Sequence, residues 1–376
     1  MMKSKKTCAF VIGTRPEAIK LAPVIKAAAA SSSIRPVVIL TAQHRKMLDQ
    51  VLDFFSISAD HDLDLMRHDQ SLSDLTARSI SRLSDVLHEC SPAITVVQGD
   101  TTTAFCGAYA AFIHRTPVAH VEAGLRSGVR TEPFPEEINR QLIDVLADLY
   151  FCATPLAAAN LHAEAKRSGV HIVGNTVIDA LLDAVGIVSK KWRPHQERLD
   201  SLREQHGIVL VTIHRRESFG RPLTEILRAV AELAAKHPSR RFVFPVHPNP
   251  NVEKPVFDAL SSSPNVLLTP PLDYPDFVWC MTKAKVILTD SGGIQEEAPS
   301  LGIPVVVARN VTERQEGVAA GVSVLAGTTY QGVLAAMEQE LCRHEPGKVA
   351  NPYGDGKSSE RIIRTIERFV TPKPPQ

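Results

Sequence analysis

Three carboxylate residues stand close behind short apolar runs or at a helix start in the first half of the 376-residue sequence. Asp100 follows residues 93–97 in the segment Gln-Gly-Asp-Thr-Thr-Thr, and Glu122 follows residues 117–121 in His-Val-Glu-Ala-Gly-Leu-Arg. Glu136 opens a helix-like stretch after Pro-Phe-Pro. Burial of a carboxylate at the mouth of an apolar strand raises its pKa, which suits it to proton transfer near neutral pH. The three residues are therefore candidates for an acid/base group.

Each of these acids also has an ordinary structural explanation. Asp100 or Thr101 is a natural cap for the helix that follows. Glu122 is near enough in sequence to Arg126 for an ion pair, and acids in the first turn of a helix, such as Glu136, are favoured by the helix dipole. The sequence alone leaves both explanations open at each position.

Basic and imidazole side chains follow other apolar runs. Arg15 and Lys20 lie in Gly-Thr-Arg-Pro-Glu-Ala-Ile-Lys, which follows the first run, and His214 and His247 follow two runs in the second half. Guanidinium groups bind phosphate well, and imidazoles change charge near neutral pH. Arg15 is therefore a candidate for holding a phosphate, and two histidines at strand ends are more than a random core would supply. Solvated surface charges and hydrogen-bonded structural histidines are the alternatives.

The segment Thr-Asp-Ser-Gly-Gly-Ile-Gln-Glu-Glu has the pattern of a strand end, a tight turn and a helix start. Backbone N–H groups at Ser291, Gly292 and Gly293 would form a cradle for a pyrophosphate, with the serine hydroxyl as a further donor. Glu297 on the same helix is placed to reach ribose hydroxyls, and Arg314 would add charge for the same phosphates. A plain Ser-Gly-Gly loop is the alternative.

These residues must be positioned by strands and helices that alternate along the chain, a pattern typical of parallel sheets covered on both faces. Ligands of such sheets bind beyond the carboxyl ends of the strands, where the candidate residues stand. We predict the α/β fold class with two Rossmann-like domains. The expected strands are residues 8–12, 36–40, 93–97, 117–121 and 149–152 in the first half, and 208–213, 242–246, 266–268, 286–289 and 304–307 in the second.

The expected domain boundaries follow the strand and charge patterns. Residues 1–186 form an N-terminal domain with the acid/base residues, and a C-terminal helix at 358–370 is predicted to join it. Residues 187–207 are charged and without strand signals, which favours a linker. Residues 208–357 form the second, phosphate-binding domain.

Composition excludes several classes of protein. Lys and Arg number 42 against 41 Asp and Glu, so neither nucleic acid nor an anionic membrane is expected as a partner. The six cysteines are scattered without a C-x-x-C pair, which favours reduced core thiols and a cytoplasmic protein. Neither a metal motif nor the G-x-G-x-x-G fingerprint of dinucleotide enzymes is present in the sequence, and we predict no metal and no cofactor.

The motifs occur together in one order: G-T-R-P-E-A-I-K, T-A-Q-H-R, Q-G-D-T-T-T, H-V-E-A-G-L-R, P-F-P-E-E-I-N-R, G-N-T-V-I-D, H-R-R-E-S-F-G and D-S-G-G-I-Q-E-E-A-P. In this order the sequence resembles the bacterial non-hydrolysing UDP-N-acetylglucosamine 2-epimerases, from about residue 8 to residue 370. The resemblance implies a GT-B architecture, in which two Rossmann-like domains face each other across a deep cleft. It also leads us to expect a homodimer.

The resemblance implies a role for each matched residue. UDP would be bound by Arg15, Phe277, Ser291, Gly292, Gly293, Glu297 and Arg314. The catalytic or sugar-contacting positions would be Lys20, Asp100, Glu122, Glu136 and His214. A second UDP-N-acetylglucosamine, acting as an allosteric activator, would contact Gln43, His44, Arg215 and His247.

The implied reaction is reversible inversion of C2 in UDP-N-acetylglucosamine to give UDP-N-acetylmannosamine for cell-surface polysaccharide synthesis. UDP is eliminated to leave 2-acetamidoglucal and is then added back. Two alternatives remain at this stage. A hydrolysing 2-epimerase would release UDP and N-acetylmannosamine, and a GT-B glycosyltransferase would share the phosphate turn but would leave three clustered carboxylates unexplained.

Overall fold

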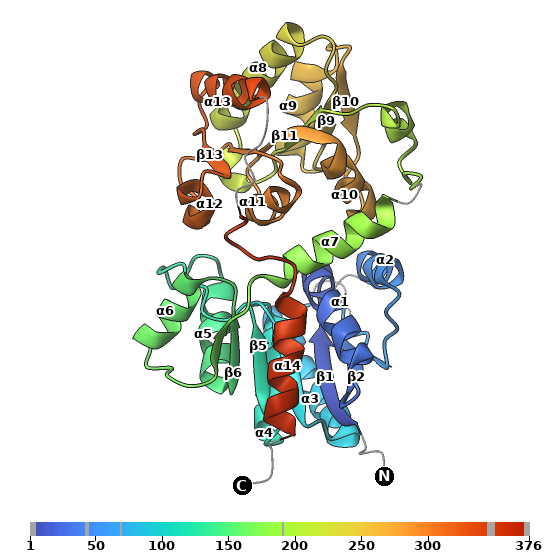
Figure 1. The fold of residues 1–376 in the computed structure, drawn as a ribbon, viewed down its shortest axis with the longest axis vertical. Helices are drawn as coiled ribbons and strands as arrows, with labels where there is room; N and C mark the ends of the chain where they lie inside the picture. Colours follow the sequence, from blue (N-terminus) through green and yellow to red (C-terminus); the bar gives the residue numbers. More distant parts are fainter. Residues whose placement is uncertain (1–4, 42–44, 68–69, 190–191, 344–349, 372–376) are drawn as a thin grey trace. The chain divides into compact units, whose positions relative to one another are not determined.

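A computed structural model describes residues 5–41, 45–67, 70–189, 192–343 and 350–371. The chain divides into two compact units (Figure 1). Unit 1 comprises residues 1–180 and 354–376, and unit 2 comprises residues 181–353. Each unit is a parallel sheet with helices in its crossovers, so the predicted α/β class with two Rossmann-like domains is confirmed.

Unit 1 is built on a seven-stranded sheet in the order β3-β2-β1-β4-β5-β6-β7. Its strands are β1 (Lys6–Ile12), β2 (Ile34–Leu40), β3 (His61–Asp62), β4 (Ile94–Gln98), β5 (Val118–Val121), β6 (Leu149–Cys152) and β7 (Val170–Ile172). Its helices are α1 (Arg15–Ala30), α2 (Arg45–Phe55), α3 (Leu72–Cys90), α4 (Thr102–Ile113), α5 (Glu136–Leu146), α6 (Pro155–Ala163), the first part of α7 (Thr176–Val188) and α14 (Ser358–Val370).

Unit 2 repeats the same strand order on a six-stranded sheet, β10-β9-β8-β11-β12-β13. The strands are β8 (Ile208–Thr212), β9 (Phe242–Pro245), β10 (Val266–Thr269), β11 (Ala284–Thr289), β12 (Val305–Val307) and β13 (Ser323–Leu325). The helices are η1 (Glu197–Leu202), η2 (Arg216–Ser218), α8 (Arg221–Lys236), α9 (Pro250–Leu260), α10 (Tyr274–Lys283), α11 (Gly292–Glu297), η3 (Ala298–Leu301), α12 (Gln315–Ala319) and α13 (Tyr330–Cys342).

The order of each sheet reverses beside its first strand. In unit 1, β2 lies on one side of β1 and β4 lies on the other. In unit 2, β9 and β11 flank β8 in the same way. The loops that follow the two central strands therefore diverge to opposite sides and leave a crevice at their carboxyl ends. The sequence places its candidate residues after these strands.

Three strands were not predicted from the sequence: β3, β7 and β13. Each is two or three residues long and lies at the edge of its sheet. An edge strand pairs on one side only and is half exposed. Its sequence therefore lacks the long run of β-branched residues that predicts a central strand. The central strands, such as β4 with five buried residues in a row, were all predicted.

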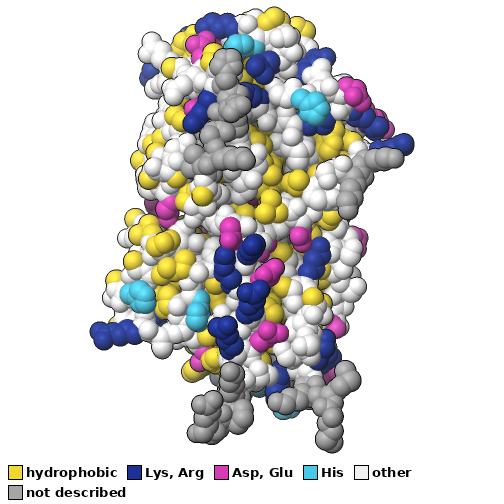
Figure 2. All heavy atoms as spheres, viewed as in Figure 1, with side chains coloured by type: hydrophobic (Ala, Val, Ile, Leu, Met, Phe, Trp, Pro, Cys, Tyr) yellow, Lys and Arg dark blue, Asp and Glu magenta, His cyan; other side chains and the backbone are white. Residues whose placement is uncertain are grey.

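Helix α14 packs along α1 of unit 1 (Figure 1). Ile362, Ile363 and Ile366 form its buried face, while charged side chains of both signs cover its outer face (Figure 2). Asp179 of α7 accepts hydrogen bonds from the backbone N–H groups of Ser358 (3.2 Å) and Ser359 (2.7 Å). This buried carboxylate satisfies donors of the first helical turn that have no partner within the helix.

The charged stretch before β8 packs on unit 2. Trp192 Nε1 and the His195 backbone N–H both donate to the buried Asp276 carboxylate, at 3.0 and 3.1 Å. Leu199 and Leu202 of η1 are fully buried. In the part of the chain that the structure describes, no helix is both long and apolar enough to span a bilayer.

We expect Asp179→Ala to loosen α14, because two backbone donors then lose their buried acceptor at a cost of about 1–3 kcal/mol. Hydrogen exchange followed by mass spectrometry should show the first turns of α14 exchanging about tenfold faster or more. Glu360→Ala is the matched control, because Glu360 forms only an exposed ion pair with Arg364. Equal exchange in the two variants would contradict this role of Asp179.

Candidate active site

Lys20 and Glu122 form an ion pair at the carboxyl end of the unit 1 sheet. Lys20 Nζ lies 2.5 Å from Glu122 Oε2, and Gln98 Nε2 donates to the same oxygen. Glu122 has a φ of 70°, in the left-handed region that a non-glycine residue enters only at a cost of about 1–2 kcal/mol. This backbone conformation is held by hydrogen bonds from the Glu122 and Ala123 N–H groups to the Phe151 carbonyl.

Arg126 is not the partner that the sequence suggested for Glu122. It pairs instead with Asp144, at 2.7 Å, and with Glu164, at 2.7 Å. The structural explanation for Glu122 is thereby replaced by a contact with Lys20, another of the predicted site residues. Two residues that lie 102 positions apart in the chain meet because Lys20 is on α1, directly after β1, and Glu122 follows β5, which is separated from β1 in the sheet only by β4.

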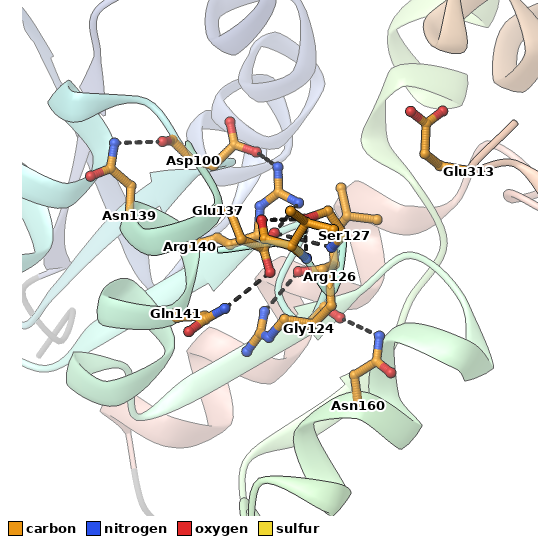
Figure 3. A network of polar contacts seen from close by, with 12 residues as sticks. Asp100, Gly124, Arg126, Ser127, Glu137, Asn139, Arg140, Gln141, Asn160 and Glu313 are labelled. Atoms are coloured by element: carbon orange, nitrogen blue, oxygen red, sulfur yellow. Dashed lines mark hydrogen bonds and ion pairs between the residues drawn. The ribbon is translucent and has the colours of Figure 1, made fainter. Parts of the chain in front are cut away.

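Asp100 is held by residues of α5 (Figure 3). Arg140 forms an ion pair with its carboxylate, and Asn139 Nδ2 donates to its carbonyl at 3.0 Å. The cap of α4 is Thr101, whose hydroxyl accepts the Ala104 N–H at 3.0 Å. The Asp100 carboxylate therefore pairs with a cation and does not cap the helix.

Glu137, the neighbour of the predicted Glu136, is the acid of this helix start that forms a buried hydrogen-bond network. Glu137 is fully buried and accepts from Arg140 Nη1, the Ser127 N–H and Gln141 Nε2, all at 3.0 Å. Glu136 begins α5 and is only half buried. Sequence reasoning did not single out Glu137, because two adjacent acids in the first turn of a helix cannot be told apart without the fold.

Glu17 is a second residue that sequence reasoning missed. Its side chain is 1% exposed and accepts from the Gly13 N–H (2.9 Å), the Thr14 N–H (2.5 Å) and the Thr101 hydroxyl (2.5 Å). Burial raises its pKa, although these hydrogen bonds act in the opposite direction. Glu17 thus joins the loop after β1 to the loop after β4. Its place inside the motif Gly-Thr-Arg-Pro-Glu was the available signal.

In unit 2, Asp290 organises the loop that carries His214. Its fully buried carboxylate accepts the backbone N–H groups of His214 (3.0 Å) and Arg215 (2.8 Å) and the Ser218 hydroxyl (2.8 Å). His214 Nδ1 lies 3.3 Å from Asp290 Oδ1. Asp290 was not singled out from the sequence, although it directly precedes the Ser-Gly-Gly turn.

The protonation of His214 depends on several neighbours. Burial lowers the pKa of His214, and His247 and Arg215 lower it further. Asp290 raises the pKa, but by less than these three effects together. The His247 ring stacks on the His214 ring with centroids 6.0 Å apart. His214 is therefore a neutral imidazole at neutral pH, able to accept or donate a proton.

The Ser291-Gly292-Gly293 turn lies beside two guanidinium groups. A Cβ at Gly292 would lie 3.2 Å from Arg314 Cζ and 3.5 Å from Arg215 Nη2. Arg314 is oriented by Glu296, whose Oε1 lies 2.9 Å from Arg314 Nε. The absence of a side chain at Gly292 keeps this space open, and two guanidinium groups beside it favour a phosphate group there.

The remaining predicted residues are distributed as follows. Arg15 begins α1 and is half buried, Phe277 lies half buried in α10, and Glu297 ends α11 and is buried. Gln43 and His44 lie outside the described residues. Arg215 and His247, predicted together with Gln43 and His44 at a second ligand site, contact Gly292 and His214 respectively.

Comparisons with known proteins agree on one family. Residues 26–367 match the family model described as UDP-N-acetylglucosamine 2-epimerase. The UDP-N-acetylglucosamine 2-epimerase of Yersinia pestis is 46% identical over 365 residues, which cover 95% of this chain and 97% of that protein. These matches extend over nearly the whole of both chains.

Two solved structures are similar to this one. The UDP-GlcNAc 2-epimerase of Neisseria meningitidis bound to UDP-GlcNAc has a TM-score of 0.84 and 43% identity, covering 96% of this chain and 99% of its own. The S. aureus MnaA–UDP structure has a TM-score of 0.85 and 42% identity, covering 99% of both chains. The predicted GT-B type of fold is the one that these neighbours share.

We expect two substitutions to move the pKa of His214 in opposite directions. Asp290→Asn removes the carboxylate that favours the imidazolium and should lower the pKa, whereas His247→Gln removes a neighbour that disfavours it and should raise the pKa. The measurement is an NMR titration of the His214 ring. Asp258→Asn, at an exposed position on α9, is the control. Shifts in the same direction would contradict the arrangement described.

Proposed function

Because the chain belongs to the UDP-N-acetylglucosamine 2-epimerase family, a family of isomerases, we propose that it interconverts UDP-N-acetylglucosamine and UDP-N-acetylmannosamine without hydrolysis. The observation that carries the proposal is the set of paired carboxylates at the carboxyl end of the unit 1 sheet, Glu122 with Lys20 and Asp100 with Arg140. A single proton transfer needs one such group, whereas inversion of a C–H centre needs a proton removed from one face and delivered to the other.

The chemistry of the sugar requires UDP to leave before C2 can be inverted. C2 has no neighbouring carbonyl, so direct deprotonation would leave a carbanion that nothing stabilises. When the bond between C1 and the UDP oxygen breaks, its electron pair leaves with UDP and C1 becomes electron-poor. The C2–H bond is then acidic, its electrons form the C1–C2 double bond of 2-acetamidoglucal, and a base takes the proton. Return of a proton to the other face of C2 and of UDP to C1 completes the reaction.

We assign the proton transfers to residues of unit 1. Asp100, Glu122 and Glu136 form the proposed acid/base set, and Lys20 supplies a cation next to Glu122. The ion pairs of Glu122 and Asp100 hold these two side chains in defined positions before the sugar binds, which avoids reorganisation during the reaction. Which carboxylate of the set removes the proton and which returns it is not assigned.

We assign UDP binding mainly to residues of unit 2. Ser291, Gly292 and Gly293 with Arg314 would hold the diphosphate, and Arg15 and His214 would stabilise the charge on the departing phosphate. Glu297 would bind the ribose, and Phe277 would lie beside the uracil. The relatives described as binding UDP-GlcNAc or UDP support this choice of ligand.

We further propose that the enzyme is a cytoplasmic homodimer that supplies an activated sugar for cell-surface polysaccharide. The six cysteines are free thiols, and burial raises the pKa of Cys106 and Cys152 to about 12, which keeps them protonated and unreactive. Free thiols, most of them buried, are typical of cytosolic proteins.

We expect wild-type enzyme incubated with UDP-N-acetylglucosamine in D2O to yield the manno epimer with deuterium at C2, detected by NMR. Asp100→Asn removes one acid/base group and should lower kcat by about 100-fold or more. Asp85→Asn, at an exposed position on α3, is the control. Full turnover by Asp100→Asn would exclude a catalytic role for Asp100. Accumulation of free N-acetylmannosamine and UDP would instead identify a hydrolysing enzyme.

If a second UDP-N-acetylglucosamine activates the enzyme, the initial rate should rise more steeply than a hyperbola as its concentration increases. The proposed contacts of this second molecule include Arg215 and His247. Sedimentation at the same enzyme concentration reports whether the active species is a dimer. Hyperbolic kinetics over the full concentration range would count against the second site.

A further inference from the structure

A histidine inside the unit 1 sheet makes two hydrogen bonds that the proposed reaction does not use directly. His120 lies on β5 and is 0% exposed. Its Nδ1 lies 2.7 Å from Asp144 Oδ1, and its Nε2 lies 2.8 Å from the carbonyl oxygen of Gly99. Both ring nitrogens are therefore within short hydrogen-bond distance of an oxygen atom.

Neither of these oxygens has a proton to donate. The Gly99 oxygen is a backbone carbonyl, which can only accept. Asp144 Oδ2 accepts from Arg126 Nη2 at 2.7 Å and from the Gly124 N–H at 3.3 Å, and both contacts favour the ionised carboxyl group. Asp144 is therefore a carboxylate, which also only accepts. A neutral imidazole donates through one nitrogen only. The lone pair of its other nitrogen would then point at a lone pair of an oxygen atom, which is repulsive.

The surrounding charges favour a positive ring. Arg126 bridges two acids, with Nη2 at 2.7 Å from Asp144 Oδ2 and Nε at 2.7 Å from Glu164 Oε1. Glu164, Arg126, Asp144 and His120 thus form a row in which the first three groups alternate in sign. A charged His120 completes the alternation and places a second cation beside the fully buried Asp144, whereas the other acid of the row, Glu164, is exposed to solvent.

The row ends on the turn that carries Asp100. Gly99 has a φ of +71° and joins β4 to Asp100. His120 holds the carbonyl before Asp100. Asn139 holds the carbonyl of Asp100 itself, and Arg140 pairs with its carboxylate (Figure 3). Because each peptide group is planar, fixing both carbonyls fixes the backbone on either side of Asp100.

We propose that His120 donates from both ring nitrogens, as an imidazolium, and positions Asp100 by holding the Gly99 carbonyl. This positioning role rests on the proposed function, in which Asp100 transfers a proton at C2. His120 does not touch the sugar and is not a catalytic residue. Its effect is to keep the Asp100 carboxylate in a productive orientation, for which small displacements are costly.

The ionisable groups beside the His120 ring come from three segments of unit 1. Asp144 comes from α5, and Arg126 comes from the loop after β5. On β6, burial and then Asp144 raise the pKa of Tyr150 and of Cys152 to about 12, so both stay neutral. The two fixed charges beside the ring therefore do not change near neutral pH.

The charge state can be tested without reference to catalysis. Protein labelled with 15N-histidine has 14 histidines, and the His120 signals are those that disappear in His120→Gln. We expect both ring nitrogens of His120 to carry protons and to show imidazolium shifts at neutral pH. An unprotonated ring nitrogen under these conditions would overturn the proposal, whatever reaction the enzyme catalyses.

The positioning role is tested by kinetics. His120→Leu should lower kcat by about tenfold or more and leave KM within about twofold, because UDP binding is assigned elsewhere. His120→Gln retains an N–H donor for Gly99 and should recover part of the loss. His171→Gln, on the edge strand β7, is the control. An unchanged kcat in His120→Leu, or an equal loss in both His120 variants, would overturn the positioning role.

Failure of the inference about His120 can be distinguished from failure of the proposed function. If the enzyme does not epimerise UDP-N-acetylglucosamine but the imidazolium signature persists, the proposed function fails and the charge assignment stands. If epimerisation is observed and His120 is neutral, the inference fails alone. Circular dichroism of both variants establishes whether they are folded, and either folded variant assigns the His120 signals by their disappearance, so that the wild-type NMR measurement stays decisive should the other variant not fold.

Discussion

Buried charge must be paired, and this requirement shapes the carboxyl ends of both sheets. Glu17, Glu137, Asp144 and Asp290 are all almost completely buried, and each accepts three or more hydrogen bonds from specific donors. An ionised group in such a position would be very costly without these partners. Because each acid accepts hydrogen bonds from a segment other than its own, satisfying its charge also fixes these segments relative to one another. The candidate site residues stand on these segments.

The same principle operates differently in the two units. In unit 1 the buried acids support partly exposed pairs, so that Glu137 orients Arg140 and Arg140 in turn holds Asp100. In unit 2 Asp290 acts alone on a loop and sets the backbone at His214 and Arg215. The first arrangement suits side chains that exchange protons, whereas the second suits cations and imidazoles that must face a phosphate in a fixed orientation.

The reversal of strand order makes these contacts possible. Loops that leave β1 and β4 run to opposite sides, so residues far apart in the chain meet beside the gap between them, as Glu17 and Thr101 do over 84 positions. Unit 2 repeats this arrangement, with His214 after β8 meeting Asp290 after β11. Two copies of one topology thus provide two polar sites of different chemistry, because the residues on the loops differ.

The sequence by itself determined the fold class, the central strands and the positions after them where polar residues gather. These follow from local patterns, since apolar periodicity and turn residues act over a few neighbours. It did not determine the partners of those residues. Asp100 was open to a capping role until Arg140 was found beside it, Glu122 was linked with Arg126 and pairs with Lys20, and Glu137 could not be told from Glu136. Only the tertiary structure decided these pairings and the roles of Glu17, Asp290 and His120, because each depends on which side chains the sheet brings within about 3 Å across long stretches of chain.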